Sequence, residues 1–372
     1  MYNFGMNASR LPRLFNLMSA SGLDALVLNP GPTLTYLTGL SFHLMERPVI
    51  LILTPNAPPA LILPELEALK LPQSAIPLKG FTYGENPLTW GAVFHTACQE
   101  LQLDGKKVGV EPTRLRYLEL RLLESSTTAQ FVNGDAAVGG MRMLKEPGEI
   151  ENMRLAVHIA QEALLATIPS IKPGKTEHEI ASELSSQLLR AGSDSEFPFT
   201  PIVSGGPNSA NPHAVPTDRP LQVGDLLVID WGAAYHGYFS DLTRTFAIGN
   251  VEDEFRQIAR IVEQANVAGR AASRPGIPAG QVDQVTRKVI VDAGYSKYFT
   301  HRTGHGLGLE GHEQPYIFAE NTQVLGEGMT YTVEPGIYLP GRGGVRIEDN
   351  MVITAGGSET LSDLPRQLQT LE

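Results

Sequence analysis

Two aspartates in the middle of the chain are spaced to meet on one face of a β-hairpin. Residues Val228–Phe246 (VIDWGAAYHGYFSDLTRTF) alternate apolar side chains into Asp230, reach a turn, and leave through a β-branched and aromatic run. With a two-residue loop at His236-Gly237, Asp230 lies opposite Thr243. Asp241 is then its diagonal neighbour, about 7–8 Å away at the backbone. Because two carboxylates this close in apolar surroundings repel each other, the hairpin indicates a bound cation.

Three further side chains of the second half complete a set of candidate metal ligands. His305 lies between two glycines, Glu334 precedes Pro335-Gly336, and Glu348 ends the run VRIE. Each of the five candidates alone has an ordinary explanation. The two aspartates could belong to turns, His305 could be a loop histidine, Glu334 could end a strand, and Glu348 could form a surface ion pair with Arg346. Together, four carboxylates and one imidazole suit manganese, cobalt or a similar divalent ion. Four negative charges favour two such ions, a pair that lowers the pKa of a water so that it attacks near neutral pH.

The ligands fall into two halves that resemble each other. A shift of 102 residues lays Pro173-Gly174 on Pro275-Gly276 and Ala191-Gly192 on Ala293-Gly294. The order helix, Pro-Gly turn, helix and Ala-Gly stop thus occurs twice, and each copy is followed by a hairpin with two acidic residues. We expect a duplicated α+β domain with pseudo-two-fold symmetry whose two ligand pairs meet near the axis.

The elements before this domain alternate between helix and strand patterns. We expect an α/β N-terminal domain over residues 1–138 and the catalytic domain over residues 139–372. The pattern predicts one helix at Ala8–Ser21 and another at Thr113–Glu124. Strands are expected at 25–28, 49–53, 60–63 and 108–110, and Leu34–Leu40 could continue the sheet. Because no glycine-rich phosphate loop follows these strands, nucleotide binding is not expected there.

Composition excludes several classes of function. The net charge is −11, and residues 141–372 hold 19 basic against 29 acidic side chains, which argues against nucleic acid or an anionic membrane as partner. No apolar run is long enough for a membrane span. The N-terminus lacks the layout of a signal peptide, so a cytoplasmic location is expected. The single cysteine, Cys98, excludes a disulfide framework and is expected to be structural.

Four motifs resemble those of one enzyme family. The segments DWGAAYHGYFSDLTRT, HRTGHGLGLEGHEQP, TVEPGIY and VRIEDN are similar to the signatures of the pita-bread metallopeptidases, which include methionine aminopeptidase, aminopeptidase P and prolidase. The resemblance spans about residues 141–355. The preceding domain is similar to the one found in the creatinase, prolidase and aminopeptidase P branch, which indicates a proline-directed enzyme.

The resemblance implies a role for each candidate residue. Asp230 would bind one metal, His305 and Glu334 the other, and Asp241 and Glu348 both; manganese is favoured, with cobalt or zinc as alternatives. Glu334 would also move the proton of the attacking water. The residues implied to contact the substrate are His213, which would assist at the leaving nitrogen, His312, which would steady the tetrahedral intermediate, and His301, Tyr338 and Arg346, which would line the pocket or orient ligands.

We therefore expect hydrolysis of an N-terminal Xaa-Pro bond in short peptides by a homodimeric enzyme. The short loop between Glu334 and Glu348 is closer to prolidases, whereas His301 favours an aminopeptidase. A prolidase must also bind a C-terminal carboxylate, for which Arg302, Arg342 and Arg346 are candidates. The alternatives are a metal-free creatinase-like hydrolase of a small amide or amidino compound and a non-catalytic binding protein, but both should have lost ligands.

Overall fold

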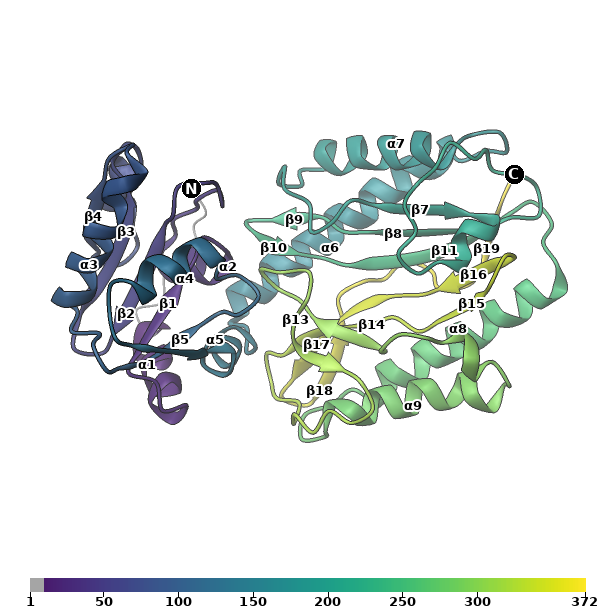
Figure 1. The fold of residues 1–372 in the computed structure, drawn as a ribbon. Coiled ribbons are helices and arrows are strands. Elements are labelled where there is room, and N and C mark those ends of the chain that lie inside the picture. The colour runs from purple at the N-terminus through teal and green to yellow at the C-terminus, as the bar shows by residue number, and fades with distance from the viewer. Residues whose placement is uncertain (1–9) are drawn as a thin grey trace. The chain divides into compact units, whose positions relative to one another are not determined.

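The computed structural model describes residues 10–372 and divides into two compact units between Arg142 and Met143 (Figure 1). The division coincides with the end of helix α5 (Asp135–Arg142), so the boundary expected between residues 138 and 139 falls inside that helix. Each unit has its own hydrophobic core and is described separately below.

The N-terminal unit is an α/β domain built on one six-stranded mixed sheet. The strand order is β4-β3-β2-β1-β5-β6, and β1 pairs antiparallel with β2 but parallel with β5. The strands are β1 Ala25–Leu28, β2 Ile50–Thr54, β3 Ala57–Pro64, β4 Lys79–Tyr83, β5 Lys107–Val110 and β6 Gln130–Asn133; besides α5, the helices are α1 Arg10–Ala20, α2 Pro32–Thr38, α3 Trp90–Glu100 and α4 Tyr117–Glu124.

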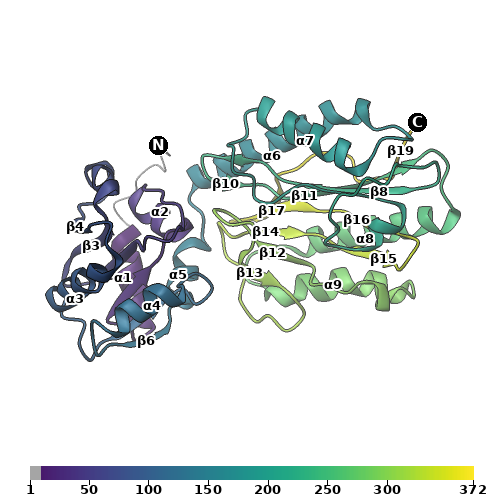
Figure 2. The same cartoon turned by 45° about the horizontal axis from the view of Figure 1, so that its top comes forward.

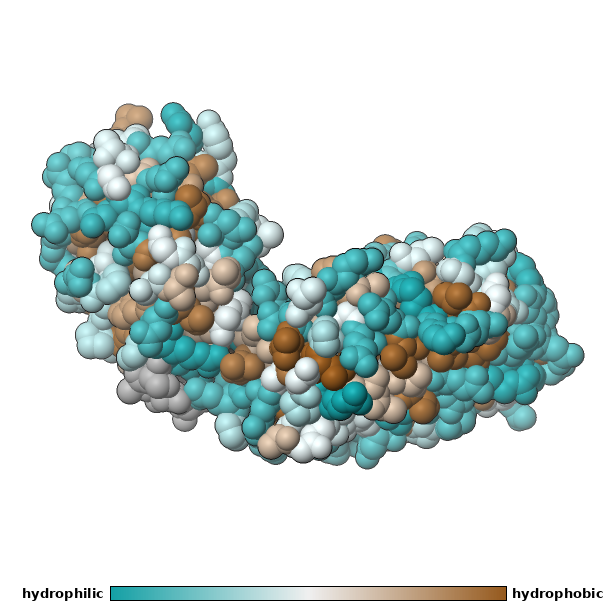
Figure 3. Space-filling view, turned by 90° about the horizontal axis from the view of Figure 1, so that it is seen from below, coloured by the Kyte–Doolittle hydropathy of each residue, from teal (hydrophilic) through white to brown (hydrophobic). Residues whose placement is uncertain are grey.

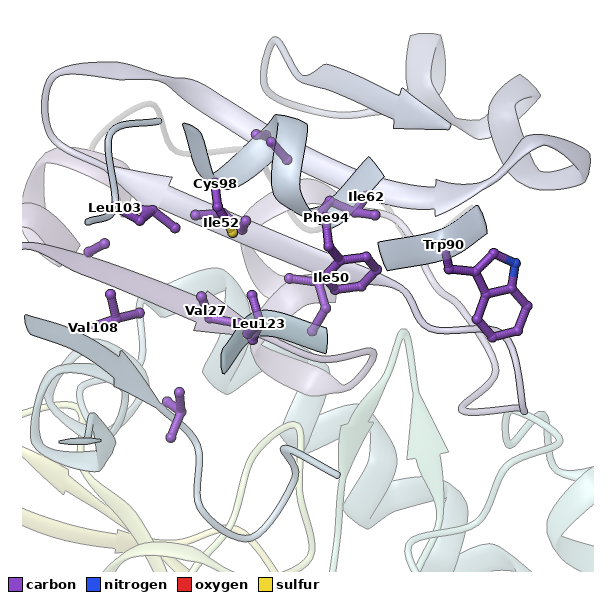
Figure 4. Packing of buried hydrophobic residues seen from close by; sticks show 14 of the residues in the cluster. Val27, Ile50, Ile52, Ile62, Trp90, Phe94, Cys98, Leu103, Val108 and Leu123 are labelled. Atoms are coloured by element: carbon purple, nitrogen blue, oxygen red, sulfur yellow. The ribbon is translucent and has the colours of Figure 1, made fainter. Parts of the chain in front are cut away.

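Helix α3 and the sheet enclose the core of this unit (Figure 4). Phe94 and Cys98 point from α3 towards Ile50 and Ile52 on β2, and all four are at most 1% exposed. Burial raises the pKa of the Cys98 thiol to about 12, which leaves it protonated and unreactive at neutral pH. Cys98 is therefore structural, as expected.

Two expectations for this unit need correction or restriction. Residues 34–40 do not continue the sheet, because Pro32 starts helix α2 and Gly39 ends it in the left-handed conformation at φ 70°. The expected helix at Ala8–Ser21 corresponds to α1, and its first two residues lie outside the described part of the chain.

The second unit contains four long helices and two main sheets. Helices α6 Pro147–Thr167 and α7 Glu177–Arg190 lie on the outer side of the first sheet, and α8 Asp253–Ala272 and α9 Ala279–Asp292 lie on that of the second (Figures 1 and 2). The first sheet has the order β19-β11-β8-β7, with β7 Ile202–Gly205, β8 Leu226–Trp231, β11 Leu242–Ile248 and β19 Gln369–Leu371.

The second sheet has the order β13-β12-β14-β17-β18. Its strands are β12 Gly304–Gly306, β13 Glu313–Ile317, β14 Thr330–Val333, β17 Asp349–Thr354 and β18 Gly357–Thr360. Two small ribbons extend the hairpins, one formed by β9 Ala234–Tyr235 and β10 Tyr238–Phe239, the other by β15 Gly336–Leu339 and β16 Gly343–Arg346.

The first hairpin has the register that the sequence predicts. Tyr235 pairs with Tyr238, and Asp230 pairs with Thr243. His236 and Gly237 form the loop with φ 50° and 77°, the doubly left-handed conformation that matches the twist of a hairpin. The β8–β11 and β9–β10 pairs thus keep the same register, and this register fixes Asp230 relative to Asp241, which directly precedes β11.

The internal repeat is visible in the backbone. Gly174 and Gly276 begin the second helix of each half from left-handed turns at φ 91° and 84°. Gly192 and Gly294 end those helices at φ 102° and 85°. In the first half Thr176 and Glu179 form a capping box at the start of the second helix. Both halves thus turn at equivalent glycines before entering their sheets.

On the face seen in Figure 3, hydrophobic residues lie among hydrophilic ones in each unit. Over the described residues 10–372, no helix is long and apolar enough to cross a bilayer.

Candidate metal centre

The five predicted ligands converge inside the second unit. Asp230 lies on β8 and Asp241 directly before β11, while His305 lies on β12. Glu334 follows β14 and Glu348 precedes β17, so the continuing register of that hairpin sets them opposite each other. The ligand atoms of Asp230, Asp241 and Glu348 lie within 4.8 Å of one another, as do those of His305, Glu334 and Glu348.

Asp230 and Glu348 each present one oxygen to the cluster. Arg346 donates to Oδ2 of Asp230 at 2.6 Å, and Thr243 donates to Oε2 of Glu348 at 2.8 Å. The other oxygens, Oδ1 of Asp230 and Oε1 of Glu348, are buried and have no hydrogen-bond partner within the described residues 10–372. Since a buried carboxylate oxygen without a partner is costly, these two atoms are suited to bind a cation.

His305 is oriented to present an unprotonated nitrogen. Its Nδ1 lies 3.1 Å from the carbonyl oxygen of Gly306, which can only accept, so Nδ1 carries the proton. Nε2 is then free to coordinate and lies 3.4 Å from Oε1 of Glu334 and 3.6 Å from Oδ2 of Asp241. Burial holds the pKa of His305 well below its usual value, which keeps the ring neutral.

The backbone around His305 packs too closely for larger residues. A Cβ on Gly304 would come within 1.9 Å of the carbonyl oxygen of Thr332 on β14. The glycines that flank His305 therefore let the neighbouring backbone approach closely. Thr332 also donates to Oε1 of Glu334 at 3.2 Å, which orients that carboxylate towards His305.

The electrostatics of the cluster favour a cation. Burial raises the pKa of Glu334 to about 8, and the negative charge of Asp230 contributes. Burial, with repulsion from Glu348, raises the pKa of Asp241 well above its usual value. Arg346 offsets one of the four carboxylate charges, and the remaining three exceed what a single divalent ion neutralises. The donor set and the unpartnered oxygens fit divalent metal ions.

The ring of His312 is tilted by 36° against that of His305, with ring centroids 3.8 Å apart. A nitrogen of His312 also lies close enough to ligand atoms of Asp241 and His305 to suggest that it could bind a metal. However, the guanidinium of Arg302 lies 3.2 Å from Nδ1 of His312 and can only donate. Nδ1 is thus an acceptor, and the proton of the neutral ring lies on Nε2. This arrangement favours His312 as a hydrogen-bond donor rather than a sixth ligand.

His301, Tyr338 and Arg346 form a chain of hydrogen bonds behind the ligands. Arg346 donates to the Tyr338 hydroxyl at 3.0 Å, and this hydroxyl lies 2.9 Å from Nε2 of His301. The other ring nitrogen of His301 lies 2.7 Å from the carbonyl oxygen of Arg302. Both nitrogens of His301 are thus used within the protein, and burial lowers the pKa of the ring to about 4. His301 can offer a substrate only its neutral ring surface.

Arg346 is oriented towards a ligand rather than towards solvent. Besides Asp230 and Tyr338, it donates to Thr243 at 3.1 Å and to the carbonyl oxygen of Pro212 at 3.3 Å. Its side chain is only 3% exposed. Of the two expected roles, the contacts therefore support the orientation of Asp230 rather than the binding of a substrate carboxylate.

His213 is the most peripheral of the predicted site residues. It is exposed, in the loop after the short 3₁₀ helix Gly206–Ala210, and its backbone nitrogen donates to the side chain of Asn211. It lies close enough to contribute to the pKa shifts of Asp230, His301 and His312, which places it at the rim of the same cluster. The bond from Arg346 to Pro212 ties this loop to the site.

Sequence reasoning missed several supporting residues. Asn350 exchanges hydrogen bonds with the backbone of Asp241, and Thr243 connects Glu348 with Arg346. The hairpin register already set Thr243 opposite Asp230, which was a usable signal. Asp349 is fully buried and forms ion pairs with Arg244 at 2.8 Å and with Arg366 at 2.7 Å. Because Arg244 lies more than 100 residues away in the sequence, no local sequence pattern could have predicted its contact with Asp349.

Comparisons with known proteins agree with this geometry. Residues 151–355 match the model of metallopeptidase family M24, and residues 10–144 match that of the creatinase/prolidase N-terminal domain. The chain belongs to metallopeptidase family M24 and has the pita-bread fold that the motifs predicted. Membership of this family implies divalent metal ions and peptide substrates.

Three similar proteins illustrate the extent of the match. The probable dipeptidase PepE of Mycobacterium tuberculosis is 37% identical over 369 residues, with 97% of this chain and 96% of that protein covered. The Xaa-Pro dipeptidase of Pyrococcus horikoshii is 34% identical over 360 residues, covering 96% and 98%. The crystal structure of dipeptidase PepE from Mycobacterium ulcerans superposes with a TM-score of 0.91 at 33% identity, covering 100% and 99%.

Proposed function

We propose that this protein is an Xaa-Pro dipeptidase that depends on two divalent metal ions. The observation that carries the proposal is the convergence of three buried carboxylates, the half-buried carboxylate of Glu334 and the neutral His305. Two oxygens of this cluster have no hydrogen-bond partner among the residues that the structure describes. The relatives named as dipeptidases, which align over nearly the whole chain, support the substrate class.

The proposal assigns the metal ions to the five convergent side chains. Asp230, Asp241, His305, Glu334 and Glu348 would hold them, with Asp241 and Glu348 shared. Bound there, the ions would supply Lewis acidity and lower the pKa of a water. The oxygen-rich donor set favours manganese, with cobalt or zinc as alternatives.

The protein's own residues position the peptide and move its protons. Glu334 accepts the proton of the attacking water and returns it to the departing imino nitrogen, with His213 assisting from the rim. His312 donates from Nε2 to the carbonyl oxygen as negative charge develops on it, because Arg302 holds Nδ1 as the acceptor. The free amine of the substrate is attracted to the acidic cluster, which limits cleavage to the first peptide bond.

Two substitutions test the metal assignment. Asp241→Ala and Glu348→Ala should each lower metal content and abolish hydrolysis of Ala-Pro, because each removes a carboxylate that would hold the ions. Metal content is measured on the purified variants and activity by release of free proline. Full activity in either variant would overturn the two-metal proposal.

An Xaa-Pro aminopeptidase is the second candidate function. It is favoured by His301, whose neutral ring lies beside Glu334 at 4.0 Å and could line a proline pocket in either enzyme. Cleavage of Ala-Pro but not Ala-Pro-Ala supports the dipeptidase, and the reverse preference supports the aminopeptidase. We also propose that the protein is a homodimer, which light scattering of the purified protein would test.

A further inference from the structure

The loop that carries His213 begins and ends at one buried carboxylate. This loop spans residues 206–216 and follows strand β7. Glu177, the first residue of α7, is 0% exposed. Its Oε1 accepts from the backbone nitrogen of Gly205 at 2.6 Å, and its Oε2 accepts from the backbone nitrogen of Thr217 at 2.8 Å. The two ends of the loop are therefore joined through a single side chain.

Two further hydrogen bonds complete the surroundings of this carboxylate. The hydroxyl of Thr217 donates to Oε2 at 2.7 Å, and the side-chain amide of Asn208 donates to the same oxygen at 2.8 Å. Glu177 thus accepts four hydrogen bonds from the base of the loop, and three of them come from N–H groups, which can only donate. Because a buried carboxylate is costly unless its oxygens are hydrogen-bonded, these contacts favour one position of the loop ends.

Separate contacts tie the first part of the loop to the metal centre. Oγ of Ser209 accepts from the backbone nitrogen of Gly344 on β16 at 2.9 Å. The carbonyl oxygen of Pro212 accepts from Arg346 at 3.3 Å. Both contacts lie before His213 in the chain, so they do not hold the part of the loop that follows it.

The part of the loop after His213 is held from the side of Glu177. Asn208, which donates to Glu177, also donates to the carbonyl oxygen of Val215 at 3.3 Å, and Thr217 is bound to the carboxylate directly. Within residues 10–372 the imidazole of His213 makes no hydrogen bond of its own, and the residue is exposed. The backbone on either side of His213 must therefore set the position of the ring.

We propose that Glu177 is a positioning residue for His213: it closes the base of the loop and so holds the imidazole at the rim of the metal centre. The inference rests on the Xaa-Pro peptidase function argued above, in which His213 assists at the leaving nitrogen. Proton transfer needs the imidazole within hydrogen-bond reach of that nitrogen, so a small displacement of the loop lowers kcat. Glu177 is buried and acts only through the loop.

The test combines Glu177→Gln with His213→Ala. Gln has the size of Glu, but either orientation of its amide turns the nitrogen towards a backbone N–H, that of Gly205 or that of Thr217. We would measure kcat and KM for Ala-Pro on the manganese-loaded wild type, both single variants and the double variant. Thr217→Val, which removes one hydrogen bond to Glu177, is a milder second variant. Melting temperature and metal content are measured on every protein.

Glu179→Gln is the matched control. Glu179 lies on the same helix, but its carboxylate is exposed and accepts from Lys175 and from the backbone nitrogen of Thr176. Since Gln serves as well as Glu in a capping box, this change keeps the start of α7 intact. The variant should have the kcat, KM and metal content of the wild type.

The expected result is a loss in kcat that disappears when His213 is absent. Glu177→Gln should lower kcat about 10- to 100-fold, the scale for a catalytic group misplaced by about 1 Å, at unchanged metal content. His213→Ala should lower kcat about 100-fold or more, as for the loss of a general acid or base. The double variant should be no slower than His213→Ala, because the loop position no longer matters without the imidazole. Thr217→Val should show a smaller loss of the same kind.

Three results would overturn the inference. The losses of Glu177→Gln and His213→Ala could multiply in the double variant, Glu177→Gln could lose metal together with activity, or either single variant could keep wild-type kcat. If Glu177→Gln does not fold, the same comparison with Thr217→Val decides. In each case wild-type cleavage of Ala-Pro leaves the proposed function standing, whereas a manganese-loaded wild type that does not cleave Ala-Pro overturns the proposed function together with the inference.

Discussion

Thr243 donates a 2.8 Å hydrogen bond to Oε2 of Glu348, and the two residues also form a backbone bridge between the halves of the second unit. The same hydroxyl accepts from Nε of Arg346, which in turn holds Asp230. Thr243 thus connects the carboxylate of Glu348 in the second hairpin, through Arg346, with the carboxylate of Asp230 in the first.

Replacing Thr243 should loosen this connection. Thr243→Val keeps the shape but leaves Arg346 Nε and Glu348 Oε2 without a partner, so we expect a loss of about 1–3 kcal/mol in the free energy of unfolding. Metal retention during dialysis should fall as well. Chemical unfolding and metal analysis check both, with Thr243→Ser as the control that keeps the hydroxyl. Equal stability of the valine and serine variants would contradict this role.

Asp349 should be a major source of stability in the second unit. It is buried between Arg244 and Arg366, with Arg270 3.7 Å away, and accepts from Ser362 at 2.6 Å. Asp349→Asn leaves these arginines without their counter-charge, and breaking a buried pair costs about 3–5 kcal/mol.

A surface pair supplies the control for this substitution. Asp292→Asn removes the exposed partner of Lys288, a helix pair worth less than about 1 kcal/mol. Urea unfolding of the two variants should therefore differ clearly. If Asp349→Asn is as stable as Asp292→Asn, the arginine cluster does not stabilise the fold.

The stability that Asp349 provides should also be lost in strong acid. Despite burial, Arg244 and Arg366 lower the pKa of Asp349 to about 2. An aspartate in an unfolded chain has a pKa of about 3.9. The contribution of Asp349 to the free energy of unfolding is therefore complete above that pH and disappears as the pH falls through 2. Unfolding of the wild type and Asp349→Asn over this range should show their difference shrinking as pH falls; a constant difference would contradict the assignment.

The chelated protein should lose stability as the pH rises. Because the pKa of Glu334 is raised to about 8 from its usual 4.5, its contribution is present below pH 4.5 and is lost as the pH rises through 8. The melting temperature in chelator should fall across this window, less steeply in Glu334→Gln. Saturating manganese should remove the fall, and a melting temperature independent of pH in chelator would contradict the electrostatic account.

The sequence predicted what local rules determine. The two-residue loop at His236-Gly237 set the register of Asp230 and Thr243, and alternation set Arg346 and Glu348 on one face, with Ile347 in the core. The repeat indicated that two hairpins would meet. These inferences need only the two-residue alternation of side chains along a strand, the type of turn in the hairpin and the number of residues between the repeated motifs.

Contacts between distant segments could not be predicted in this way. The ion pair of Arg346 with Asp230 joins residues 116 positions apart, and the alternative of a surface pair between Arg346 and Glu348 was wrong because both are buried. Among the local expectations, the strand at 34–40 was wrong because Thr35 and Tyr36 favour strands while Pro32 and Gly39 fix a helix. The roles of residues such as Arg346 depend on their side-chain partners in the folded protein, which the spacing of residues in the sequence does not reveal.

The most direct test of the central claim is a metal titration of activity. The protein is stripped with chelator, the chelator is removed, and Ala-Pro hydrolysis is followed as manganese is added in known equivalents. We predict no hydrolysis at the start and a rise that reaches its plateau at two ions per chain. Full hydrolysis in the stripped protein, or a plateau at one ion, would contradict the two-metal account.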